Sequence, residues 1–186
     1  YDQPSKGILW GWEVSAYIVT KAIASGAYLV AMLAMFAGLI EMTDELWWQL
    51  IIGSTIFLGI TGILLIKDLD RPERFLYVLL RPNWDSWLVK GAYILGAFGA
   101  ILACSGAVIF FDLDRNYLDY LAIAGIPLAT LTGIYTAWLF GQASGRNWSK
   151  DRYLTLKMLI EMVILGVASL VFLISSELIY WAVACV

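Results

Sequence analysis

The chain has 186 residues, of which 61% are hydrophobic and only 15% are charged, with a formal net charge of −3. Soluble domains typically carry about 25% charged residues, so this composition argues against a soluble domain and indicates an integral membrane protein. There is no histidine, and the two cysteines lie in an apolar stretch and next to the end, so we expect this chain to bind no haem and no metal.

Five long apolar stretches follow one another, at about 14–40, 47–66, 88–111, 119–142 and 154–174. Each is near or above the roughly 20 residues that a helix needs to cross the hydrocarbon layer. Tryptophan and tyrosine stand at the starts of several stretches, as is typical of the membrane–water boundary. The sequence therefore predicts an all-α integral membrane protein, a transmembrane helix bundle of about five spans, with one four-helix bundle plus an additional helix.

Several small and irregular residues bear on how these helices pack. Pro127 lies inside the fourth stretch and should kink that helix. Glycines recur within the stretches and predict close helix–helix packing. These glycines are Gly26, Gly53, Gly59, Gly62, Gly91, Gly96, Gly99 and Gly106.

We expect one transmembrane bundle over residues 1–186, with its core at 10–148. The segment 67–90 contains two Arg-Pro steps, and the apolar piece between its prolines is too short to cross a bilayer. Because this segment is also amphipathic and rich in aromatic residues, it is predicted to be a structured connector at the membrane interface. Residues 154–186 are predicted to form a further helix, which either continues past Ile174 or gives way to another helix that the chain does not complete.

Basic residues gather at one end of the predicted bundle. With five spans, ten of the twelve lysines and arginines lie before the first helix, in 67–90 or in 143–157. Arg115 alone lies at the opposite end, among acidic residues, and Lys21 lies inside the first helix. The positive-inside rule places the basic end, and with it the N-terminus, in the cytoplasm.

A stripe of polar residues runs along the first predicted helix. Glu13, Tyr17, Lys21, Ser25 and Tyr28 are spaced by four, four, four and three residues, which puts them on one face. Lys21 lies roughly 10 Å inside the helix at 1.5 Å per residue. An ammonium group at that depth is costly unless it is paired or hydrated.

The buried position of Lys21 supports two interpretations. In the structural one, Lys21 forms an ion pair with Glu161 or Glu13 that fixes helix packing. In the functional one, it belongs to a polar pocket, open to the basic end, that binds an oxygen-bearing ligand and handles protons. Candidate neighbours at similar depth are Thr61, Asp68, Tyr135 and Glu161.

Three segments carry sequence motifs that recur together in a known protein family. The connector reads DLDRPERFLYVLLRPNWDSWLVKGAYIL, the first helix has Trp12-Glu13 and then KAIASGAYL, and the fourth reads GIPLATLTGIYTAWLFGQASGRNW. In this order they resemble the NrfD-like family of polysulfide reductase membrane subunits, over most of residues 10–148. The version most similar in character is the quinol-binding membrane subunit of alternative complex III.

The resemblance implies a function in electron transport. It points to a quinone- or quinol-binding membrane subunit, with menaquinone or ubiquinone as the quinone, in a respiratory oxidoreductase complex of the bacterial cytoplasmic membrane. Electrons would pass between the quinol pool and an iron–sulfur subunit, because this chain has no redox centre of its own, and protons would be released or taken up. The implied surroundings are that subunit, other subunits of the complex and the lipid bilayer, with no nucleic acid.

The family's site positions can be carried over to this sequence. The quinone-pocket positions fall on Tyr17, where many members have histidine nearby, and on Tyr135, while the connector's acidic residue falls on Asp68. Taken together with the residues chosen for their depth in the helices, the residues expected in the quinone pocket or at its rim are Tyr17, Lys21, Tyr135, Arg71 and Arg74. The residues expected to transfer protons are Asp68, Glu13 and Glu161.

Several alternatives stay open at this point. Family members usually have eight to ten spans in two four-helix bundles, so this chain is either part of a longer polypeptide or a reduced form. In several relatives the pocket end meets an extracytoplasmic iron–sulfur subunit, and the basic connectors would then be a docking surface rather than a sign of the cytoplasm. Two other functions compete: a membrane anchor that binds no quinone, and a proton-conducting module lined by Glu13, Lys21, Glu161 and Glu177.

Overall fold

The computed structural model describes residues 12–68, 80–142 and 152–184, which form five α-helices and no strand. The helices are α1 (Trp12–Phe36), α2 (Asp44–Asp68), α4 (Trp87–Phe110), α5 (Asn116–Gln142) and α6 (Leu154–Ala184). Each of the five is long and apolar enough to cross a membrane. The predicted all-α transmembrane bundle is therefore confirmed for the described part of the chain.

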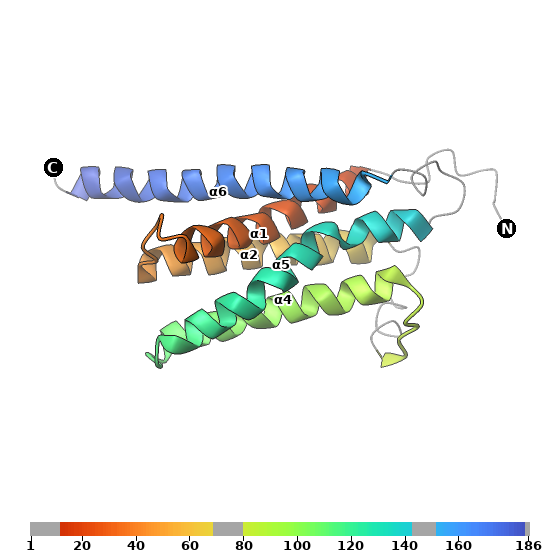
Figure 1. The fold of residues 1–186 in the computed structure, drawn as a ribbon, viewed down its shortest axis with the longest axis horizontal. Helices are drawn as coiled ribbons and strands as arrows, with labels where there is room; N and C mark the ends of the chain where they lie inside the picture. The colour runs from red at the N-terminus through yellow and green to blue at the C-terminus, as the bar shows by residue number, and fades with distance from the viewer. Residues whose placement is uncertain (1–11, 69–79, 143–151, 185–186) are drawn as a thin grey trace.

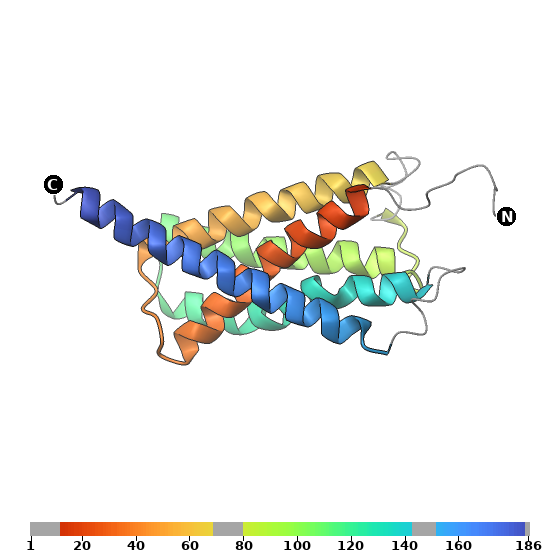
Figure 2. The ribbon, with the colours of Figure 1, turned by 90° about the horizontal axis from the view of Figure 1, so that it is seen from above.

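The five helices run roughly along one axis, with α1 inside the bundle. Helix α1 packs against α2, α5 and α6, while α4 packs against α5 and α2. Figure 1 shows α6 along one side of the bundle and α4 along the other, with α1, α2 and α5 between them. Helix α6 is the least buried of the five and α1 the most. In both views α6 extends past the other helices at the C-terminal end (Figures 1 and 2).

Two helices end in the same kind of turn at one end of the bundle. After α1, Gly38 has φ of 69°, its N–H bonds to the carbonyl oxygen of Met35, and that of Leu39 bonds to Ala34. After α4, Asp112 takes the corresponding place with φ of 50°. This left-handed C-terminal turn is the Schellman motif, in which glycine is favoured because it has no Cβ.

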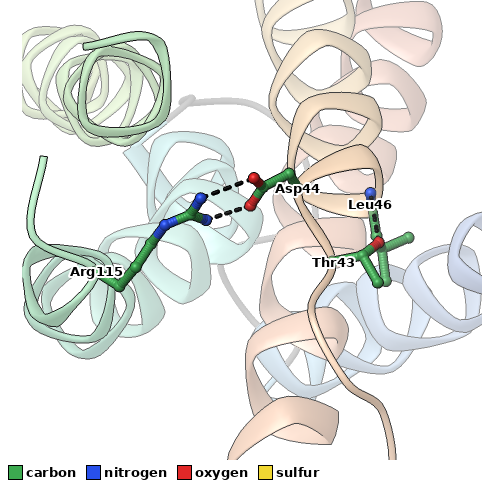
Figure 3. A network of polar contacts seen from close by, with 4 residues as sticks. All are labelled: Thr43, Asp44, Leu46 and Arg115. Atoms are coloured by element: carbon green, nitrogen blue, oxygen red, sulfur yellow. Dashed lines mark hydrogen bonds and ion pairs between the residues drawn. The ribbon is translucent and has the colours of Figure 1, made fainter. Parts of the chain in front are cut away.

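At this end of the bundle, an ion pair links the start of α2 to the residue before α5. The guanidinium of Arg115 donates hydrogen bonds to both carboxylate oxygens of Asp44, with Nη2 2.7 Å from Oδ2 (Figure 3). The hydrogen bond to Asp44 raises the pKa of Arg115 above its ordinary value, so the guanidinium stays charged. The pair explains why a single arginine lies at the acidic end of the bundle. Beside it, the Thr43 hydroxyl caps α2 by accepting a hydrogen bond from the N–H of Leu46 (Figure 3).

Exchanging the two charges tests whether this pair orders the turns. Asp44→Arg and Arg115→Asp should each lower the melting temperature slightly, because the pair is exposed and screened by solvent. The double exchange should restore it. The measurement is thermal unfolding in lipid nanodiscs at low and high salt, with the exposed Glu41→Gln as a control. A double variant as unstable as the two single variants combined would show that the pair contributes nothing.

The glycines divide into close contacts and open positions. Helices α1 and α6 cross at Gly26 and Gly166, where a Cβ on Gly26 would overlap the carbonyl oxygen of Met162. Close packing is thereby confirmed at Gly26. By contrast, a Cβ at four of the other glycines would meet no atom within 4 Å, so the prediction of close packing was wrong there. These are Gly53, Gly59, Gly62 and Gly96.

Helix α5 continues through Pro127, and its ribbon changes direction partway along (Figure 1).

At the basic end, the start of α4 is connected to the end of α5. The Gln142 side chain accepts a hydrogen bond from the N–H of Trp87 at 2.9 Å and donates one to the carbonyl oxygen of Asp85 at 2.8 Å. Trp87 also stacks on Trp138, with ring centroids 4.6 Å apart. Residues 69–79 of the expected connector lie outside the described part of the chain.

Candidate functional site

The centre of the candidate site is Lys21, on the face of α1 that points into the bundle. Its side chain has no exposed surface. This follows from the position of α1 inside the bundle, where the polar face of the helix is covered by its neighbours. The ammonium donates a hydrogen bond to the Thr136 hydroxyl of α5 at 2.6 Å. It also lies 4.5 Å from the centroid of the Tyr135 ring, a cation–π distance. The Thr136 hydroxyl in turn lies 3.3 Å from the sulfur of Met158 on α6.

Tyr135 lies against Lys21 and is also fully buried. Its hydroxyl group has no hydrogen-bond partner among the described residues. The ring rests directly on the backbone of α4 at Gly91, where a Cβ would collide with the ring carbons. A buried hydroxyl without a partner is uncommon in proteins and calls for an explanation in each case.

Tyr17 belongs to the same buried cluster as Tyr135 and is only 2% exposed. It lies one helical turn before Lys21 on α1. The structure thus brings together three of the expected pocket residues, from two helices more than 100 residues apart in sequence. Their proximity is a structural fact, whereas their role in a quinone pocket stays a prediction.

This arrangement has more hydrogen-bond donors than acceptors. An ammonium group has three N–H donors, and one of those on Lys21 is bonded, to Thr136. No carboxylate of the described residues forms an ion pair with Lys21, and the Tyr135 hydroxyl is likewise unbonded. Buried donors that lack acceptors are costly. The site is therefore chemically suited to a ligand that brings oxygen acceptors.

The ion pair of the structural interpretation, between Lys21 and Glu161 or Glu13, is not formed among the described residues. Glu13 lies instead 3.5 Å from Lys67, which also lies over the Trp12 ring at the basic end. Glu161 is on the exposed face of α6. The structural interpretation fails for Glu161 because α6 turns Met158 and Met162 toward the bundle interior, which leaves Glu161 on the outside.

Other expected neighbours of Lys21 are placed as follows. Thr61 lies at the predicted depth, but its hydroxyl is bonded to that of Thr20 at 2.8 Å rather than to Lys21. Helix α2 ends at Asp68. Outside the described part of the chain are Arg71, Arg74 and the side chains of Asp68 and Glu177.

Two residues of the site were not singled out as its members from the sequence. Thr136 provides the acceptor for Lys21, and Gly91 provides the space for the Tyr135 ring. The sequence feature that could have pointed to Thr136 is its place next to Tyr135 at the depth of Lys21. Gly91 had no signal that set it apart from the other glycines of α4. Across the described residues, no group of three or more histidine, cysteine, aspartate or glutamate side chains could hold a metal ion.

The geometry defines a multi-span helical membrane protein with a buried, donor-rich polar site between α1 and α5. The chain belongs to the NrfD family, since the family model described as "Polysulphide reductase, NrfD" matches residues 2–179. A similar curated protein is a "Putative dimethyl sulfoxide reductase membrane subunit" of Halobacterium salinarum, 22% identical over 162 residues. That alignment covers 74% of this chain and 36% of the relative, so the chain spans little more than a third of that protein. No solved structure matches the chain.

Proposed function

We propose that this chain is the quinone-binding membrane subunit of a respiratory oxidoreductase complex in the bacterial cytoplasmic membrane. The observation that supports this function is the contact between Lys21 and Tyr135, whose donors are buried and incompletely bonded. A quinone or quinol, such as menaquinone or ubiquinone, brings the oxygen atoms that such donors need. Membership of the family and the similarity to a reductase membrane subunit support the same assignment.

The residues of the site would divide the work between binding and proton transfer. Lys21 and Tyr135 donate hydrogen bonds to an oxygen of the headgroup, and Tyr17 lies beside them. Because both donors are covered by other side chains, the headgroup reaches them by displacing neighbours. Met158 is suited to such a displacement, because its unbranched side chain adapts easily and it touches Thr136.

Protons and electrons would be taken up by different groups. Oxidation of a quinol releases two protons and two electrons. On this proposal Asp68, with which α2 ends, accepts the protons one after the other and passes them on, with Glu13 as the second carboxylate of the route. Arg71 and Arg74 remain the residues that the family resemblance leads us to expect at the rim. Glu161 faces away from Lys21, so we leave it out of this route. The sequence has no histidine and no cysteine cluster, so the electrons pass to an iron–sulfur partner subunit.

Replacing Tyr135 with phenylalanine tests the binding role. Removing a buried hydroxyl that has no partner should leave stability unchanged or raise it. Loss of its hydrogen bond to the headgroup should lower kcat/KM for quinol by about 3–10-fold. Both are measured on the purified complex, with Tyr120→Phe, on the exposed side of the same helix, as the matched control.

The opposite outcome would favour a different function. Unchanged quinol turnover and inhibitor binding in Tyr135→Phe would remove the quinone site from this cluster. The chain would then be a membrane anchor for peripheral subunits, with its buried polar groups serving only packing.

A second variant addresses the proton. Asp68→Asn should slow quinol turnover and change its pH dependence, because an amide cannot accept a proton at this position. The measurement is the pH profile of kcat and of kcat/KM in the purified complex. A profile that keeps the shape of the unmodified protein's would exclude Asp68 from the proton route.

A further inference from the structure

A second buried hydroxyl group on α5 has no hydrogen-bond partner. The Oγ1 atom of Thr132 is fully buried and forms no hydrogen bond with any described residue. A hydroxyl group inside a helix can donate to the carbonyl oxygen four residues earlier. Four hydroxyls of this bundle do so, namely those of Ser25, Thr61, Thr130 and Ser169. Thr132 departs from this pattern, and its unbonded hydroxyl calls for an explanation.

Thr132 lies on the same face of α5 as the residues around Lys21. It precedes Thr136 by four residues, which places the two threonines on one side of the helix. Along the axis they are roughly 6 Å apart at 1.5 Å per residue. This is close to the separation of the two oxygens of a para-quinone, which lie at opposite ends of one six-membered ring. Thr132 is therefore spaced to reach one end of a headgroup whose other end is at Lys21 and Tyr135.

Two methionines of α6 cover this stretch of α5. The sulfur of Met158 lies 3.3 Å from the Thr136 hydroxyl, and the sulfur of Met162 lies against Gly133, where a Cβ would overlap it. In both views the last part of α5 lies beside the first part of α6 (Figures 1 and 2). Methionine side chains are unbranched and flexible. Their movement offers a way to uncover Thr132 and Thr136 that requires no shift of a helix.

Two other sides of the site are closed by backbone rather than by flexible side chains. Toward α4, the Tyr135 ring rests directly on the backbone at Gly91. Between α1 and α6, the backbones meet at Gly26 and Gly166. A headgroup could enter on either side only if a helix moved. The space between α5 and α6 is therefore the more accessible place for a headgroup.

We propose that Thr132 is a further binding residue of this site and donates a hydrogen bond to the second oxygen of the quinone headgroup. This inference rests on the function proposed above. The headgroup lies along α5, in the space that the side chains of Met158 and Met162 fill. One oxygen accepts from Lys21 and Tyr135, and the other accepts from Thr132. Because one end meets a charged donor and the other a neutral hydroxyl, the two carbonyl groups of the bound quinone are inequivalent.

Infrared difference spectroscopy of the purified complex tests the contact. The probe is decylubiquinone or menadione, whichever the complex turns over, isotope-labelled at one carbonyl at a time. A hydrogen bond lowers the stretching frequency of a carbonyl group. Thr132→Val removes the hydroxyl and keeps the shape of the side chain, so one carbonyl band should move toward that of the free quinone while the other stays. Thr132→Ser keeps the hydroxyl and should keep both bands. The matched control is Thr130→Val, because the Thr130 hydroxyl is bonded to Ile126.

The affinity for the same quinone is a second readout. Thr132→Val should weaken binding about 3–10-fold, as expected for the loss of one hydrogen bond between neutral groups. It should leave the melting temperature unchanged or raise it, because the hydroxyl has no partner in the protein.

Unchanged bands and unchanged affinity in Thr132→Val would overturn the inference. Lys21→Met shows whether the proposed function falls with it, because that variant should move the other carbonyl band. If Lys21→Met moves its band and Thr132→Val moves none, Thr132 is not a binding residue and the quinone site stands. If neither variant moves a band, the quinone is bound outside this cluster, and both proposals fail.

Discussion

Replacing Lys21 with methionine is expected to lower quinol turnover and, at the same time, to leave stability unchanged or raise it. The ammonium is fully buried and bonded only to a neutral hydroxyl, with no ion pair to any described carboxylate. Replacing a buried ion pair by apolar side chains of similar volume is often neutral or stabilising by about 1–4 kcal/mol, and a lone buried charge has no partner to offset the cost of removing it from water. A charged hydrogen bond to the quinol oxygen is worth about 1.5–3 kcal/mol, so kcat/KM should fall by about 10–100-fold.

The opposite signs of the two effects separate a functional lysine from a structural one. Melting temperature and kcat/KM are measured on the same purified complex. Lys90→Met removes one positive charge at the start of α4, near Trp87 rather than Tyr135, and should change neither quantity much. Unchanged kcat/KM in Lys21→Met would exclude the lysine from quinol binding and leave it a role in packing alone.

The sequence predicted the helices well because their lengths follow from the membrane. A run of about 20 apolar residues has few alternatives to a spanning helix, and all five runs became helices. The polar stripe of α1 was also readable, because Tyr17 and Lys21 differ chemically from the apolar residues around them. Tyr135 was a candidate neighbour of Lys21 because of its depth in the fourth predicted helix, and the family motif pointed to the same residue.

The face that each helix turns inward was harder to predict. Helix α6 is apolar nearly all round, so nothing in its sequence shows that Met158 and Met162 point inward while Glu161 points outward. That orientation depends on where Gly26 and Gly166 allow α1 and α6 to approach. The depth of Glu161 along α6 could be predicted from the sequence, but the rotation of α6 about its own axis could not. The structural interpretation, a pair between Lys21 and Glu161, failed for this reason.

The glycines of α4 show the same limit and lead to the second large effect. Gly91 and Gly96 are five residues apart and therefore point to different sides of α4, which the sequence does not distinguish. A Cβ on Gly91 would collide with the Tyr135 ring, whereas one on Gly96 would meet nothing within 4 Å. Gly91→Ala is thus expected to shift Tyr135 away from Lys21, and Gly96→Ala is its matched control.

For Gly91→Ala, overpacking should cost about 1–3 kcal/mol of stability. Displacing Tyr135 by even about 1 Å can lower turnover by as much as about 100-fold, so we expect kcat/KM for quinol to fall by about 10–100-fold. Gly96→Ala should keep full turnover and gain up to about 1 kcal/mol, because alanine favours the helix more than glycine does. Both variants are compared by thermal unfolding and steady-state quinol oxidation in the assembled complex. Equal turnover in the two variants would mean that the position of the Tyr135 ring against α4 does not matter for the reaction, and the site would have to be sought elsewhere in the bundle.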